Sequence, residues 1–136
     1  MKRVLNVLSI LSCLSLVAVV GIAIVSAASN TYTYTVSPDI PAAYTASTNY
    51  NSTGLGVNTK LLERENSAYP VNVRHTLYEE GWLWDTEAGV RDLSMDQVNA
   101  IYMFKFTGLK TDKSYHTSIQ GRDNVGRVEI RLYSAT

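Results

Sequence analysis

The sequence predicts an all-β domain, an antiparallel sandwich of about seven strands that follows a hydrophobic N-terminal segment. All nine tyrosines, both tryptophans and both phenylalanines lie beyond residue 30, where threonine and valine are also frequent. Such residues suit a pleated, half-buried surface. Short runs of alternating apolar and polar residues are separated by turn signals, and no long helical pattern interrupts them.

The expected strands are short segments, most of which alternate apolar and polar residues, although the stretch 44–50 is polar and alternates only loosely. They cover residues 31–36, 44–50, 55–65, 69–79, 100–106, 114–121 and 127–134. The alternation is clearest in the fourth segment, where the odd-numbered residues from Tyr69 to Leu77 form an apolar face that includes His75. The stretch 80–99 is irregular. Because Ser94 and Gln97 have capping-box spacing, we expect one helical turn near residues 94–100.

The first 28 residues differ from the rest and are expected to be a secretory signal peptide. Lys2 and Arg3 precede an uncharged, mainly apolar run from residue 4 to residue 25. Small residues follow, so we expect cleavage after Ala27 or Ala28. The apolar run is about 22 residues long and could also span a bilayer. The alternative is therefore an uncleaved membrane anchor, with the domain still outside the cytoplasm because the positive residues stay inside.

Cysteine use and charge limit the compartment and the partners. Cys13 is the only cysteine and lies in the apolar run, so the domain at 29–136 has neither a disulfide nor a thiolate metal site. The absence of disulfides favours a secreted bacterial protein. Without Lys2 and Arg3, ten basic residues stand against twelve acidic ones, a net charge of −2. We expect no nucleic-acid partner, and membrane contact only through an uncleaved N-terminal segment.

One stretch, residues 106–121, carries a resemblance to a known family. It reads FTGLKTDKSYHTSIQG, in which a Gly-Leu turn ending at Leu109 is separated by five residues from Tyr115. This pattern resembles the E–F region of fibronectin type III and related immunoglobulin-like sandwiches, and the wider likeness covers about residues 102–134. The resemblance implies an immunoglobulin-like strand arrangement. It also implies a tyrosine corner, in which the Tyr115 hydroxyl bonds to backbone just upstream.

Trp82 and Trp84 are the strongest candidates for a binding site. They are two residues apart, so in an extended strand they would share a face, with Tyr78 and Asp85 close by in sequence. If exposed, these side chains would form an aromatic platform for a sugar ring, a peptide or a partner protein. The alternative is that both tryptophans pack on the core or cover a sheet edge.

No catalytic or metal-binding motif is present. His75 and His116 lack partners at the spacing of a catalytic triad or a zinc site, and both are interpreted as packed or surface residues. We therefore expect a small secreted, non-enzymatic binding protein without a cofactor, whose partner is a cell-envelope glycan or protein. The alternatives are a secreted bacteriocin-like toxin or signalling protein and, with least support, a small secreted hydrolase.

Overall fold

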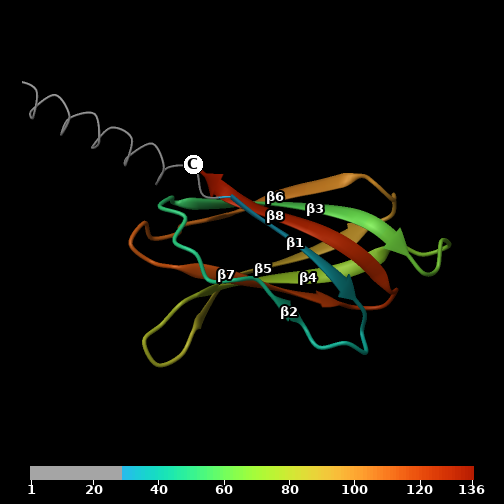
Figure 1. Ribbon diagram of the computed structural model, residues 1–136, viewed down its shortest axis with the longest axis horizontal. Coiled ribbons are helices and arrows are strands. Elements are labelled where there is room, and N and C mark those ends of the chain that lie inside the picture. Colours follow the sequence, from blue (N-terminus) through green and yellow to red (C-terminus); the bar gives the residue numbers. More distant parts are fainter. Residues whose placement is uncertain (1–28) are drawn as a thin grey trace, which may run out of the picture.

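The computed structural model describes residues 29–136, which form eight β-strands and, over that range, no helix (Figure 1). The strands are β1 Ser29–Val36, β2 Ala43–Tyr44, β3 Gly54–Arg64, β4 Val71–Glu79, β5 Thr86–Met95, β6 Ile101–Thr107, β7 Tyr115–Gly121 and β8 Gly126–Ala135. The predicted all-β class is confirmed. The signal peptide and its cleavage at Ala27 or Ala28 lie outside the described residues. Within those residues, no helix is long and apolar enough to cross a membrane.

The strands form two antiparallel four-stranded sheets, which Figure 1 shows as two layers. One sheet has the order β1-β8-β3-β6 and the other the order β2-β7-β4-β5. The first strand pairs with the last, the second with the seventh, the third with the sixth and the fourth with the fifth. This nested pairing is that of a jelly roll, in which two Greek keys build a double-sheet sandwich.

The strand order corrects one part of the sequence prediction. In an immunoglobulin domain the last two strands are neighbours in one sheet. Here β8 lies between β1 and β3, whereas β7 lies between β2 and β4 in the other sheet. The immunoglobulin-like arrangement inferred from residues 106–121 is therefore wrong. The turn in that stretch depends on short-range contacts, which do not specify how distant strands pair.

The predicted strand at 44–50 is much shorter in the structure, and one strand was missed. Only Ala43 and Tyr44 form β2, followed by a single bridge between Thr48 and Tyr115. Strand β5 occupies part of the stretch expected to be irregular. It is a sheet edge and most of its residues are exposed, so its sequence carries no apolar alternation.

The helical turn expected near residues 94–100 is also absent. Ser94 belongs to β5, so it does not cap a helix. A turn follows in which Asn99 has a φ of 68°. The Tyr102 hydroxyl accepts hydrogen bonds from the backbone N–H groups of Asp96 and Gln97, at 3.0 and 3.1 Å. A tyrosine from β6 thus satisfies the amides that a capping side chain would otherwise bind.

The hydrophobic core lies between the two sheets and is built by alternate residues of each strand. In β8, the inward residues Val128, Ile130 and Leu132 are fully buried while their neighbours face outward. The apolar face predicted for the segment 69–79 is buried within β4, where His75 is fully buried too. Tyr69 was assigned to the same face, but it precedes β4 and is 63% exposed, so that part of the prediction is wrong. Each large apolar side chain buried in this way contributes about 1.5–3 kcal/mol to folding.

The antiparallel sheets divide the connecting loops between two opposite ends of the molecule (Figure 1). The loops β2–β3, β4–β5 and β6–β7 gather at one end, where β1 begins and β8 finishes. The loops β1–β2, β3–β4, β5–β6 and β7–β8 gather at the other end. The first end carries the two tryptophans, and the second carries a polar pocket.

Candidate functional site

The loop between β4 and β5 is a tight turn that presents both tryptophans. The Gly81 N–H donates a hydrogen bond to Asp85 Oδ1 at 3.2 Å and so closes the loop. A Cβ atom on Gly81 would lie 1.9 Å from the carbonyl oxygen of Trp84, so this close approach requires glycine. At the base of the loop, the Glu80 N–H donates to the Ser114 carbonyl oxygen at 2.9 Å. The loop is thereby fastened to the chain that precedes β7.

Three consecutive large apolar side chains at the tip of this loop are exposed. The exposed fraction is 94% for Trp82, 68% for Leu83 and 73% for Trp84. We call these three residues the aromatic tip. Large apolar side chains that cluster on the surface mark contact sites more reliably than apolar residues scattered singly.

A half-buried aromatic cluster lies beside the loop. The rings of Tyr78 and His116 are stacked, with centroids 5.2 Å apart and planes 18° from parallel. Tyr44 from β2 packs against both rings, at centroid distances of 6.3 and 6.1 Å. His116 Nε2 lies 3.5 Å from Asp85 Oδ2, which connects the cluster to the loop.

The structure brings the predicted binding residues together in a different way from that expected. Tyr78 and Asp85 meet through His116, which the sequence did not assign to this set. Trp82 and Trp84 do not lie on a strand face, because the chain bends at residues 82–84. They are exposed, so the alternative in which they pack on the core does not hold. Ligand binding by Trp82, Trp84, Tyr78 and Asp85 stays a prediction.

The pair Leu109 and Tyr115 forms a structural junction at the same end of the molecule. Both side chains are buried. The Tyr115 hydroxyl accepts a hydrogen bond from the Lys110 backbone N–H at 2.8 Å and donates one to the Glu79 carboxylate at 3.2 Å. Burial raises the pKa of Tyr115, so the hydroxyl keeps its proton. This side chain therefore joins the β6–β7 loop to the end of β4.

His75 is a core residue. Its Nε2 atom lies 3.1 Å from the Thr59 hydroxyl of β3, so the contact crosses between the two sheets. The ring centroid is 5.2 Å from that of Phe104. Burial lowers the pKa of His75 to about 4, and the imidazole is therefore neutral at physiological pH. This environment agrees with the interpretation of His75 as a packed residue.

The acidic residues between β4 and β6 are distributed among separate partners. Glu79 pairs with Lys110, Asp85 with His116, Asp92 with Arg74 and Asp96 with the Tyr102 hydroxyl. No group of three or more metal-ligating side chains occurs in the part of the chain that the structure describes. These carboxylates thus support local structure individually, and their placement gives no shared site.

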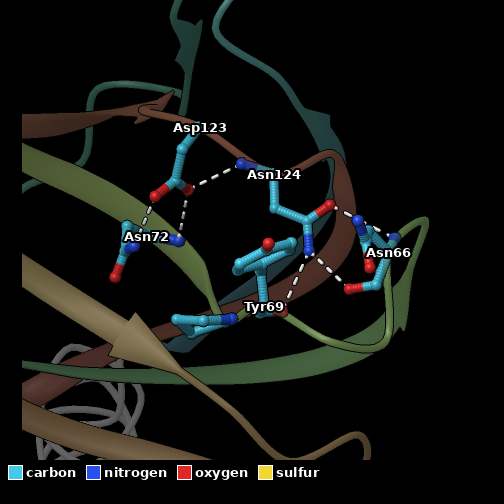
Figure 2. Close-up of a pocket in the computed structure, with 6 residues that line it drawn as sticks. Asn66, Tyr69, Asn72, Asp123 and Asn124 are labelled. Atoms are coloured by element: carbon cyan, nitrogen blue, oxygen red, sulfur yellow. Dashed lines mark hydrogen bonds between the residues drawn. The ribbon is translucent and has the colours of Figure 1, made fainter.

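A pocket with a volume of about 500 Å³ lies at the opposite end of the molecule (Figure 2). It opens between the β3–β4 and β7–β8 loops, and we call it the end pocket. Its lining consists of Asn66, Tyr69, Pro70, Asn72, Asp123 and Asn124. The volume falls within the range of about 300–1,000 Å³ that is usual for small-molecule sites.

Hydrogen bonds within the lining hold the polar groups in place, as the dashed lines in Figure 2 show. Asp123 Oδ1 accepts from the backbone N–H groups of Asn72 and Asn124, at 3.2 and 2.6 Å. Asp123 Oδ2 accepts from the Asn72 side-chain amide. This last bond is the main cause that lowers the pKa of Asp123 and keeps the carboxyl ionised at neutral pH.

The sequence analysis did not identify the end pocket. Asn66 and Asn124 are expected in turns, where asparagine is common, so neither residue indicates a site. The pocket exists because Asp123 follows β7 and reaches Asn72 at the start of the neighbouring strand β4. Their separation of 51 positions depends on the strand pairing, which the sequence did not predict.

Comparisons with known proteins reveal only distant structural likenesses. No protein-family model matches the chain, and no curated protein matches it. The crystal structure of the Yersinia pseudotuberculosis-derived mitogen is similar over 79% of this chain and 86% of the mitogen chain, with 14% identity and a TM-score of 0.48.

Two further solved structures are less similar. A structure of Bacillus endospore appendages, a family of disulfide-linked pili, matches over 81% of this chain and 88% of that chain, at 12% identity and a TM-score of 0.42. A structure of the Gx strain of infectious bursal disease virus matches over 82% of this chain but only 31% of the viral chain, at 10% identity and a TM-score of 0.41. These likenesses carry no functional argument.

Proposed function

We propose that this protein is a small secreted, non-enzymatic binding module that contacts a cell-envelope partner through its aromatic tip. The observation that carries the proposal is the exposure of Trp82, Leu83 and Trp84 at the end of a braced loop. Tryptophan is enriched among the residues that dominate binding energy, because it buries a large area with few rotatable bonds. A module that places two tryptophans in solvent is suited to burying them against a partner.

The surroundings of the aromatic tip support this role. Acidic side chains of Glu80, Asp85 and Glu87 flank the three apolar residues along the chain. An apolar centre with a polar rim is the usual composition of a contact site, because the rim stays hydrated while the centre is desolvated. The hydrogen bond from Gly81 to Asp85 shapes the loop before the partner arrives, which lowers the entropic cost of binding.

The experiment uses the intrinsic fluorescence of the protein. Both tryptophans of the chain lie in the aromatic tip, so the emission reports on this loop alone. We expect red-shifted emission that iodide quenches in the free protein. A panel of glycans and cell-envelope fractions is then tested for a member that protects the emission from quenching.

Replacement of both tryptophans tests the role of the tip. The W82A/W84A double variant should lose binding to the protecting fraction, while its melting temperature stays close to that of the unchanged protein because exposed substitutions cost little. I101A/M103A is the matched control, since it removes two exposed apolar side chains from β6 and should leave binding intact. Retained binding by W82A/W84A, or a large loss of stability, would refute the proposal.

A further inference from the structure

We propose that the end pocket binds a neutral pyranose sugar of a glycan. This inference goes beyond the proposed role of the aromatic tip, because it concerns a different surface at the opposite end of the molecule. It rests on a combination of an exposed aromatic ring, a fixed carboxylate and two side-chain amides, each with one atom outside the hydrogen bonds of the lining, in one concave site (Figure 2).

The aromatic ring supplies the apolar part of the site. Tyr69 lines the pocket, and 63% of its surface is exposed. A pyranose ring has an apolar face of C–H groups and a rim of hydroxyls. The face of an aromatic ring carries negative charge density, so it attracts polarised C–H groups as well as burying them. Tyr69 is therefore placed to stack against one face of the sugar while the hydroxyl rim meets polar groups.

The polar groups offer both donors and acceptors for sugar hydroxyls. Asn66 Oδ1 accepts from the Ala68 N–H at 3.0 Å, which leaves its Nδ2 group outside that bond as a donor. Asn72 donates its amide to Asp123, so its Oδ1 atom is the remaining acceptor. Within residues 29–136, Asn66 Nδ2 and Asn72 Oδ1 form no side-chain hydrogen bond. The ionised Asp123 carboxylate adds a strong acceptor.

The pocket is organised before any ligand enters. Asn124 Nδ2 donates to the carbonyl oxygens of Asn66 and Tyr69, at 2.8 and 3.0 Å, and its Oδ1 atom accepts from the Asn66 N–H at 3.2 Å. One side chain of the β7–β8 loop thus fixes the whole β3–β4 loop. Preorganised groups lose little conformational entropy on binding, which matters for sugars because each hydroxyl contact is weak in water.

Charge selects a neutral ligand. The pocket lining contains no lysine or arginine, and Asp123 carries a negative charge. A phosphate or an acidic sugar would face this carboxylate with no cation in the end-pocket lining to offset it, whereas the hydroxyls of a neutral sugar can donate hydrogen bonds to the carboxylate. A second hollow of about 410 Å³ shares Asn72 and Asp123 with the end pocket, and its lining adds one basic residue, Arg122, and one acidic residue, Asp92, whose charges offset each other. The ligand therefore has room for a second sugar unit, so we expect disaccharides to bind more tightly than monosaccharides.

The test is nuclear magnetic resonance of the isotope-labelled exported protein, because it locates the binding. The probes are glucose, galactose, mannose and N-acetylglucosamine, followed by cellobiose, lactose and chitobiose. We expect at least one probe to shift the side-chain amide signals of Asn66 and Asn72 and to leave the indole N–H signals of Trp82 and Trp84 unchanged. No shift of the amide signals with any probe, or shifts confined to the indoles, would overturn the proposal.

Variants then separate stacking from general folding effects. Y69A should weaken binding of the active probe by about tenfold, whereas Y69F keeps the ring and should bind as before. Y44A is the matched control, since Tyr44 is 58% exposed but lies on β2 away from the pocket. W82A/W84A should retain sugar binding in the end pocket, so the two proposals can fail separately. Equal affinity of Y69A and the unchanged protein would rule out the stacking role.

Discussion

At the scale of single residues, His75 shows how a polar side chain is accommodated in an apolar core. Its Nε2 atom meets the Thr59 hydroxyl, but its Nδ1 atom has no hydrogen-bond partner among residues 29–136. A protonated imidazole would therefore carry a charge into a site with no carboxylate bonded to it. Burial makes this charge costly and so lowers the pKa of His75, which makes the residue a source of acid sensitivity.

The pH dependence of stability follows from this shift. The folded-state pKa of His75 is about 4, below the ordinary value of 6.5, so the unfolded chain takes up the proton first. The stabilising contribution is complete above about pH 6.5 and is lost as the pH falls towards 4, by roughly 3 kcal/mol in all. Urea denaturation over this range should show the loss in the unchanged protein. H75Q should show a much smaller loss, and H116Q is the control that should keep it.

At the scale of elements, Tyr115 ties together three segments that are far apart in sequence. Its hydroxyl bonds to Lys110 in the β6–β7 loop and to Glu79 at the end of β4, while its backbone pairs with Thr48. Leu109 is buried in the same junction. The turn spacing that resembles immunoglobulin-like domains therefore reflects a local packing solution that is also compatible with a jelly roll.

Removal of this hydroxyl has a defined energetic consequence. Y115F leaves the ring in the core but deprives the Lys110 N–H of its acceptor, so we expect a loss of ~1 kcal/mol in the free energy of unfolding. Chemical denaturation measures this change directly. Y102F is a useful comparison, because the Tyr102 hydroxyl also accepts backbone N–H bonds but in an exposed turn, and it should cost less. An unchanged midpoint for Y115F would remove the structural role of the hydroxyl.

The individual elements also show which parts of the fold and of the candidate sites can be predicted from the sequence. Strands with one buried face, such as β4 and β8, were predictable because their apolar residues alternate. Strand β5 was not, since its side chains are mostly exposed and its position at the edge depends on pairing with β4. The aromatic tip was identified by residue type, but its exposure depends on the bend at 82–84. The end pocket depends on the pairing of β4 with β7, and this pairing cannot be predicted from residue types alone.

At the scale of the whole molecule, the nested pairing places the two proposed contact surfaces at opposite ends of one rigid sandwich. The strand β8 makes this possible, because it closes the first sheet between β1 and β3 and buries Val128, Ile130 and Leu132 between the sheets. Loops at either end can then vary without disturbing the core. This separation of scaffold and loops is the general reason that binding residues gather on loops.

The same topology predicts where the molecule opens. Strands β8, β3, β7 and β4 have neighbours on both sides, whereas β1, β6, β2 and β5 lie at sheet edges. Amide protons of the central strands should exchange with solvent only through global unfolding, and those of the edge strands through smaller local openings. We expect β8 to be the most protected and β5 among the least, since β5 also buries little side-chain surface.

Hydrogen exchange followed by nuclear magnetic resonance tests this order strand by strand. Protection of β5 equal to that of β8 would contradict it, because such protection requires a hydrogen-bonding neighbour on the free edge of β5.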